Sequence, residues 1–299
     1  MSQGKSALMK HENRWFFIFI LPWIIGFFSF QIGPMVYSLI MSLCNWEIIS
    51  SPKFIGLENY KTFFTDPLIK QCFKVTFLFA LMTIPTGIVL GILLALLMNQ
   101  PVKGITIFRT LYYLPAVTSA VSAAILWIFV FDPQYGILNY LLKRYFSIQG
   151  PPWLGSETWA LPALAIMSLW GIGGSMIIYL AALQSIPTQL YEAAEIDGAN
   201  SIQKFFSITL PMLTPAIFFN LVMGIIGTLQ TFTQAFVTTN GGPANATLFY
   251  ALYLYNNAFR YYKMGYASAL AWMLLIIIFV ITRIVFRTSN WVYYEAESR

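Results

Sequence analysis

The sequence predicts an all-α integral membrane protein with six transmembrane helices and a short helical loop between the fourth and the fifth. Its 299 residues are 58% hydrophobic and only 9% charged, which lies outside the range of ordinary globular domains. Uncharged runs also recur at the length of about 20 residues that a helix needs to cross a bilayer. We place the six spans at residues 15–38, 74–98, 108–131, 160–184, 213–236 and 265–286.

The first uncharged run begins at Trp15, directly after the charged segment "KHENR", and in that respect resembles a signal peptide. It is too long for one and lacks the small-residue cleavage pattern. We therefore expect a retained span that bends at Gly33 and Pro34. The chain then divides into an N-terminal tail of residues 1–14, a transmembrane domain of residues 15–288 and a C-terminal tail of residues 289–299.

The orientation of the spans is predicted from the Lys and Arg residues beside their ends, because such residues favour the cytoplasmic side. We expect both termini and the loop 187–211 in the cytoplasm. Cys44 and Cys72 then lie near the outer mouth, where two lone apolar thiols are expected rather than a disulfide. The basic residues behind this orientation are Lys5, Lys10, Arg14, Lys103, Arg109, Arg283 and Arg287.

What the sequence lacks excludes several function classes. No predicted span contains Asp or Glu, which counts against proton-coupled transport. His11 is the only histidine, so neither a histidine metal cluster nor a Ser/His/Asp triad can be assembled. Gly4-Lys5-Ser6 lacks the upstream glycine of a phosphate-binding loop, and the scattered Lys and Arg residues form no nucleic-acid patch. We expect no enzyme activity, metal or cofactor in this chain, so the energy for active transport would come from another subunit.

The loop "YEAAEIDGANSIQKFFSITLP", residues 191–211, predicts two short helices. Pro187 can begin the first, which runs over residues 188–197, and Gly198 can end it in a left-handed conformation. Asn200 and Gln203 have the spacing of a capping box at the start of the second. We expect neither helix to be long enough to span, with Pro211 and Pro215 marking the entry into the fifth span.

The charge of this loop favours a protein partner over a lipid surface. Interfacial helices usually present Lys and Arg to anionic lipid, whereas this loop carries Glu192, Glu195 and Asp197 against the single Lys204. An acidic helix beside a membrane is better suited to a basic groove on another protein.

The stretch "EAAEIDGANSIQKFFSITLP" also resembles the signature of bacterial binding-protein-dependent ABC importers, which is EAA, three residues, Gly, nine residues, Ile, any residue and Leu-Pro. In that family the loop is the coupling helix, which sits in a cleft of a cytoplasmic ATPase and moves with it. The resemblance therefore implies an ATPase-coupling role for this loop, including Asp197. The matching positions are Glu192, Ala193, Ala194, Gly198, Ile208, Leu210 and Pro211.

Further segments resemble the carbohydrate-uptake branch of these permeases, and the resemblance runs from about Arg14 to Arg287. It implies a bacterial cytoplasmic membrane, a second permease subunit, two ATPase subunits that bind ATP and Mg, and an extracytoplasmic sugar-binding protein. The segments are "FIGLENYKTFF", "FRTLYYLPAVTSAVSAAILWIFVFDPQYGILNYLL", "LQSIPTQLYEAAEIDGA" and "TTNGGPANAT".

A substrate path is predicted on the fourth and fifth spans. Asn220, Gly224, Thr228 and Thr231 share one helix face, which suits either close packing or a wet path; we favour packing for the glycines and lining for Asn220 and Thr228. A sugar needs an aromatic platform with amide or hydroxyl partners, and Trp170 would supply the platform. In related permeases the sugar contacts matching positions, although glycines stand here at 174 and 224. The span-four candidates are Met167, Trp170, Gly171 and Gly174, with Ser268 and Trp272 of the sixth span as weaker ones.

The outer loop Asn240-Gly241-Gly242-Pro243 is a strong turn signal. The resemblance implies that it faces the binding protein, and a purely structural turn is an equal alternative. Two other functions stay open: an ABC permease for another polar solute such as glycerol phosphate, and a non-transporting scaffold that recruits a cytoplasmic protein. The spans carry positive charges only near their ends, which favours a neutral sugar.

Overall fold

The computed structural model describes residues 2–293, with side chains from Trp15 onward. The described chain divides by its contacts into two units, Met1–Thr65 with Tyr255–Met273, and Asp66–Leu254 with Leu274–Arg299. The expected tails at residues 1–14 and 289–299 lie partly outside this description. The side chains of Lys5, Lys10, His11 and Arg14 belong to the part that is not described.

The first unit begins with one long helical stretch. Helix α1 (Ser2–Phe27) continues through a π-helical turn, Phe28–Ile32, into α2 (Gly33–Ser42). The π turn ends directly before Gly33 and Pro34, where the sequence predicts a bend, and the Gly33 N–H donates to the carbonyl of Phe28. Proline lacks an N–H and crowds the carbonyl of the preceding turn, and a π turn is one way for a helix to accommodate it. The span Trp15–Ser42 is therefore continuous.

A small antiparallel pair closes the first unit, with β1 (Cys44–Asn45) beside β2 (Lys53–Phe54). The buried Asn59 of α3 (Glu58–Thr65) donates to the carbonyls of Ser42 and Cys44 at 2.8 and 2.9 Å. The N–H of Gly265, at the start of α15 (Met264–Arg287), donates to the carbonyl of Trp46. These bonds attach α3 and the start of α15 to the backbone of β1 and of the residues beside it.

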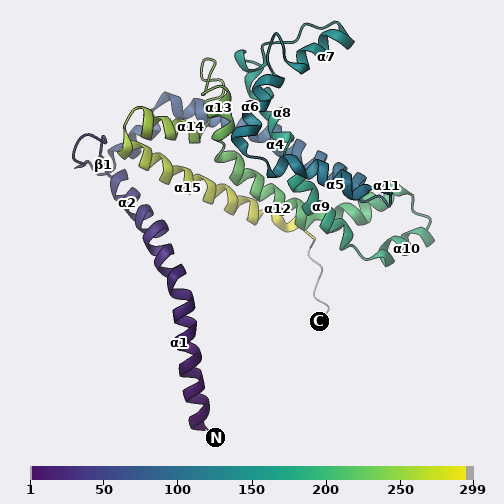
Figure 1. Cartoon of the computed structure of the whole chain (residues 1–299), viewed down its shortest axis with the longest axis horizontal. Coiled ribbons are helices and arrows are strands. Elements are labelled where there is room, and N and C mark those ends of the chain that lie inside the picture. Colours follow the sequence, from purple (N-terminus) through teal and green to yellow (C-terminus); the bar gives the residue numbers. More distant parts are fainter. Residues whose placement is uncertain (1, 294–299) are drawn as a thin grey trace. The chain divides into compact units, whose positions relative to one another are not determined.

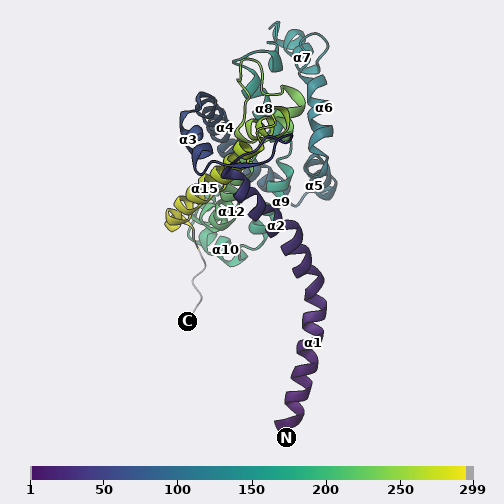
Figure 2. The ribbon, with the colours of Figure 1, turned by 90° about the vertical axis from the view of Figure 1, so that its left-hand side faces the viewer.

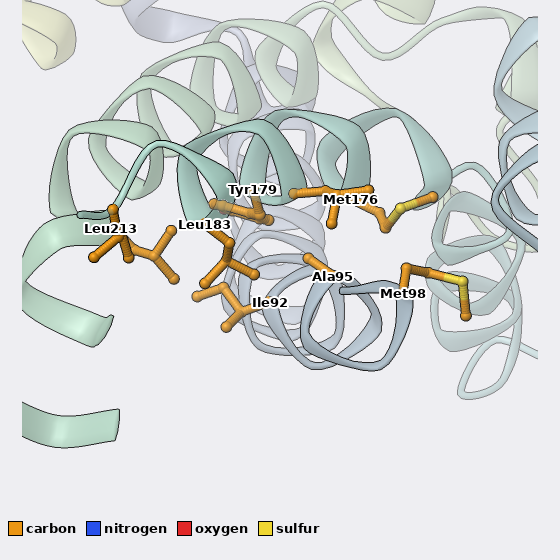
Figure 3. Close-up of a cluster of buried hydrophobic side chains, with 9 residues drawn as sticks. Ile92, Ala95, Met98, Met176, Tyr179, Leu183 and Leu213 are labelled. Atoms are coloured by element: carbon orange, nitrogen blue, oxygen red, sulfur yellow. The ribbon is translucent and has the colours of Figure 1, made fainter. Parts of the chain in front are cut away.

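The second unit has its core where α4 (Pro67–Met98), α9 (Gly173–Gln184) and α12 (Leu210–Leu229) pack against one another (Figure 1). Asp66 begins α4 by accepting the N–H of Leu68 with its side chain. Figure 3 shows the buried cluster at this junction: Ile92, Ala95 and Met98 of α4, Met176, Tyr179 and Leu183 of α9, and Leu213 of α12. These three helices supply most of the residues that line the candidate site.

Two of the six predicted spans are bent pairs of helices. The third consists of α5 (Ile105–Tyr113) with a short 3₁₀ turn to Val117, followed by α6 (Ala120–Val130) at 100°. The fourth consists of α8 (Ala160–Leu169) and α9, which meet at 44°. Among the described residues, four continuous helices and these two pairs are long and apolar enough to cross a membrane, which makes four spans, or up to six if each pair counts as one.

The fifth predicted span begins earlier than expected. The loop's second helix, α11 (Ser201–Lys204), runs through a π-helical turn, Phe205–Thr209, directly into α12 and on to α13 (Thr233–Thr238). Ser201–Thr238 is one apolar stretch, so the expectation of a separate short helix before the span was wrong. The π turn carries the backbone past Pro211, and the N–H of Leu210 bonds to the carbonyl of Phe205.

The last described residues fold back onto the second unit. A 3₁₀ turn, Ser289–Trp291, places Trp291 edge to face on Phe218 of α12. Val292 is buried, and the N–H of Tyr293 donates to Thr214 Oγ1 at 2.7 Å. Residues 289–293 are thus a packed segment against the start of α12. The remainder of the predicted tail, residues 294–299, lies outside the described residues.

Candidate functional site

A cavity of about 520 Å³ lies among α4, α8, α9, α12, the first residue of α6 and the chain that follows α12. Its polar groups are hydroxyls and amides, and none of the described residues that line it is charged. Apolar side chains such as Ile84, Met223 and Phe232 make up most of the remaining wall. The lining residues are Phe79, Thr83, Ile84, Gly87, Ile88, Ala120, Ser168, Leu169, Ser175, Tyr179, Asn220, Met223, Gly224, Gly227, Thr228, Thr231, Phe232, Thr233 and Gln234.

The predicted face of the fifth span lies in this wall. Asn220, Gly224, Thr228 and Thr231 all line the cavity, as their shared helical face requires. Asn220 donates its amide to the carbonyl of Ala216 at 2.9 Å, and Thr228 donates to the carbonyl of Gly224 at 2.6 Å. The Thr228 O–H and one of the two N–H groups of the Asn220 amide are thus used within the helix, which leaves the second amide N–H and the side-chain oxygens for a ligand.

The structure does not bring the span-four candidates to the cavity. Met167 is buried in the core, and Trp170 packs edge to face on Trp127, with ring centroids 6.2 Å apart. A Cβ on Gly174 would touch Ala116 at 3.7 Å, and Gly171 is also outside the lining. The cavity is lined instead by Ser168 and Leu169 of α8 and by Ser175 and Tyr179 of α9, so a different face of the bent pair is turned toward it.

Tyr179 is a lining residue that the sequence reasoning missed. Its side chain is 0% exposed, and its hydroxyl has no hydrogen-bond partner among the described residues. Gly91 of α4 makes room for the ring, since a Cβ there would be 3.0 Å from Cε2 of Tyr179 and from Oγ of Ser175. The available signal was a lone phenol at membrane depth in "MIIYLAAL", an apolar stretch without another hydroxyl.

The loop between the fourth and fifth spans has the local structure that its sequence predicts. Helix α10 (Thr188–Ile196) ends before Gly198, whose φ of +76° is left-handed. The N–H of Ala199 returns to the carbonyl of Ala194 at 2.9 Å, as in a Schellman ending. Both bonds of the capping box between Asn200 and Gln203 are present. The predicted turn and cap are therefore confirmed.

Two contacts join the halves of this loop. Lys204 Nζ lies 2.7 Å from Glu195 Oε1, and the hydroxyls of Tyr191 and Thr209 are 2.9 Å apart. The hydrogen bond from Lys204 lowers the pKa of the exposed Glu195 carboxyl. The loop is thus a braced unit rather than two independent helices.

The predicted coupling residues divide between surface and core. Glu192, Ala193, Asp197 and Gly198 are exposed, and Ile196 beside them is 87% exposed. Ala194, Leu210 and Pro211 are half-buried, and Ile208 packs against the cluster of Figure 3. The Glu192 end of the loop is therefore open to a partner, while the Ile208 end is attached to the core.

The turn that contains Asn240 and Pro243 is held by contacts within the second unit. Asn240 and Gly241 have positive φ, and the peptide bond between Gly242 and Pro243 is cis. Thr247 Oγ1 donates to the carbonyl of Gly242 at 2.7 Å, and Gly241 is buried while Asn240 is exposed. The turn signal is confirmed, and a contact of this turn with another protein stays a prediction.

Other predicted residues are not among those that line the cavity. Ser268 and Trp272 belong to the first unit, where both are half-buried. Cys44 and Cys72 are free, buried thiols. Within the part of the chain that the structure describes, no group of three or more His, Cys, Asp or Glu side chains could hold a metal ion.

Comparison with known proteins agrees with this architecture. Residues 87–292 match the family described as "Binding-protein-dependent transport system inner membrane component". The chain is 44% identical over 298 residues to "Probable ABC transporter permease protein YesP" of Bacillus subtilis (strain 168), covering 98% of this chain and 96% of that protein. It is 34% identical over 294 residues to "Lactose transport system permease protein LacF" of Rhizobium radiobacter, covering 96% and 98%.

A solved structure shares the fold at a TM-score of 0.84, with 25% identity over 96% of this chain and 100% of the other. It is the crystal structure of a bacterial ABC transporter involved in the import of the acidic polysaccharide alginate. The matched family covers more than half of the chain, and the sequence relatives cover nearly all of it. The chain therefore belongs to the family of binding-protein-dependent transport system inner membrane components.

Proposed function

We propose that this chain is a permease subunit of an ABC importer that moves a carbohydrate into a bacterial cell. The observation that carries the proposal is the 520 Å³ cavity, whose lining combines apolar surface with hydroxyl and amide groups and carries no charge. A sugar presents apolar ring faces and hydroxyl edges, so this lining is complementary to it. Relatives named for lactose, for multiple sugars and for arabinooligosaccharides support the same substrate class.

The loop between α10 and α12 is proposed to receive the movement of a cytoplasmic ATPase. Its exposed end, with Glu192, Ile196 and Gly198, would meet the ATPase, and its bracing contacts would let it move as one body. Because α11 continues into α12 without a break, a displacement of the loop would tilt the helix that carries Asn220 and Thr228. The cavity would thereby open to the outside to receive the sugar.

The proposed assembly contains a second permease subunit, two ATPase subunits that bind ATP and Mg, and an extracytoplasmic sugar-binding protein. This chain would then cross the cytoplasmic membrane six times, with the two bent pairs as single spans and both termini in the cytoplasm. The binding protein is expected to meet the turn that contains Asn240 and Pro243. A solved alginate transporter in complex with a pentasaccharide-bound periplasmic protein supports this arrangement.

Uptake by the reconstituted complex tests the proposal. The ligand that co-purifies with the associated binding protein is identified by mass spectrometry and used, radiolabelled, in proteoliposomes with internal ATP. We expect Glu192→Lys and Gly198→Asp to abolish uptake without changing the affinity of the binding protein. Normal uptake in both variants would contradict the coupling role.

A paired test separates transport from a scaffold that only recruits a cytoplasmic protein. Asn220→Leu and Thr228→Val remove polar groups of the cavity and should reduce uptake, whereas a scaffold would tolerate both. Phe219→Ala is the matched control, since Phe219 is exposed on the same helix and does not line the cavity. For glycerol phosphate, the other solute considered, the uncharged lining offers no cation to pair with the phosphate.

A further inference from the structure

A second cavity, of about 610 Å³, lies in the segment between α6 and α8. It is built around α7 (Ile137–Phe146) and the chain on both sides of that helix. Figures 1 and 2 both show α7 beyond the end of α6, away from the junction of α4, α9 and α12. The two cavities share no lining residue, so this one is separate from the proposed translocation site.

The walls of this cavity are held in place by the hydrogen bonds of the buried Asn139. Asn139 is 8% exposed; its amide donates to the carbonyls of Pro133 and Pro151, and its oxygen accepts the indole N–H of Trp153 at 2.7 Å. Gly150 fits closely against it, since a Cβ there would be 1.9 Å from Asn139 Oδ1. A pocket with fixed walls loses little conformational entropy when a ligand binds.

The polar side chains that line this cavity have hydrogen-bond donors and acceptors that are available to a ligand. Gln134, Tyr140, Lys143, Ser147 and Gln149 line it, and their side chains make no hydrogen bond or ion pair with the described residues. No carboxylate is among the lining residues, which leaves the Lys143 ammonium without a counter-charge in the pocket. Tyr140 is 62% exposed, so its ring is open to a ligand.

We propose that this cavity binds a saccharide unit that carries a carboxylate. The ring of Tyr140 offers a flat face for the C–H surface of a sugar, and the amides and hydroxyl suit its hydroxyl groups. Lys143 would pair with the carboxylate of a uronic acid unit. The volume lies within the range of about 300–1,000 Å³ that is usual for small-molecule sites. The proposal does not require the chain to transport sugar, because it concerns binding at a separate site.

Binding measured on the full chain in lipid nanodiscs tests this site, with trigalacturonate as the acidic probe and maltotriose as the neutral one. We expect calorimetric titration to show at least tenfold tighter binding of trigalacturonate. Lys143→Gln should weaken this binding at least tenfold. Arg144→Gln, which removes the same charge from the next residue outside the lining, should change it less than twofold.

Two further variants locate the bound sugar. Tyr140→Ala should weaken the binding of trigalacturonate, and Asn220→Leu in the first cavity should leave it unchanged. Three results would overturn the proposal: no detectable binding, equal losses in Lys143→Gln and Arg144→Gln, or loss in Asn220→Leu instead. Equal affinities for the two trisaccharides would refute the recognition of a carboxylate. Uptake by the wild-type complex is measured separately. Normal uptake without binding of trigalacturonate would refute this inference alone, and binding without uptake would refute the proposed import alone.

Discussion

Replacing Gly173 by alanine should separate α5 from α9 and destabilise the second unit. A Cβ at this position would lie 2.0 Å from the carbonyl oxygen of Tyr112, 2.7 Å from its carbon and 2.9 Å from Cα of Tyr113. All three are backbone atoms, so no side-chain rotation can relieve the contact. Carbon contacts are optimal at about 3.5–4.0 Å, which requires a displacement of about 1.5 Å at the closest atom.

The expected cost follows from this overlap. Overpacking of a well-packed core costs about 1–3 kcal/mol, and alanine returns up to about 1 kcal/mol through its better helix propensity. Because the clash is with backbone atoms, the upper end of the cost applies, which leaves a net loss of about 2 kcal/mol. This should lower the thermal midpoint by several degrees, since each kcal/mol corresponds to about 2–4 °C in proteins of about 150–250 residues.

Gly174→Ala is the matched control, because it makes the same chemical change one residue later. A Cβ at Gly174 meets only Cβ of Ala116, at 3.7 Å, which is an ordinary van der Waals contact. Its midpoint should equal or exceed that of the wild type. Both variants are heated in the same detergent while tryptophan fluorescence is followed. If Gly173→Ala unfolds at or above the midpoint of Gly174→Ala, the close approach of α5 and α9 described above is wrong.

Three further changes can be measured by the same method. Tyr179→Phe should leave the midpoint unchanged or raise it, because it removes a buried hydroxyl without a partner; a fall of several degrees would mean that the hydroxyl is bonded. Thr214→Val should lower the midpoint slightly, by the loss of about 0.5–1.5 kcal/mol, because the N–H of Tyr293 loses its acceptor; an unchanged midpoint would show that residues 289–293 are not held there. The ion pair of Glu195 and Lys204 should stabilise the folded protein only where the carboxylate is ionised. Its contribution to stability is fully present above the ordinary carboxyl pKa and disappears as pH falls through the lowered pKa of Glu195. Lys204→Met should therefore differ from the wild type at pH 7 more than in acid, and a difference that grows in acid would contradict this sign.

The local structure of the loop between α10 and α12 was predictable because it depends on neighbouring residues. Gly198 takes a positive φ that other residues avoid, and Asn200 and Gln203 satisfy each other's backbone N–H groups three residues apart. The bond of Lys204 to Glu195 was not predicted, since it joins two helices across the turn. Its formation depends on how the turn folds in three dimensions.

Of the residues that line the candidate cavity, those of α12 were predicted from the sequence and those of α8 and α9 were not. Asn220 and Thr228 lie on one uninterrupted helix, α12, where spacing in sequence becomes position on a face. Trp170 packs on Trp127 instead, and the residues of its bent pair that line the cavity are Ser168, Leu169, Ser175 and Tyr179. Tyr179 lines the cavity because Gly91, 88 residues away in sequence, leaves room for its ring.

The sequence by itself determined the membrane class, the position of the apolar stretches and the turn at Gly198, because these follow from composition and from residues within a few positions of one another. Only the tertiary structure decided that the loop continues into α12, since the passage of a helix across Pro211 depends on a π turn rather than on proline content. It also decided which side chains meet at the two cavities, because helix bends and close glycine contacts bring together residues whose spacing carries no such signal.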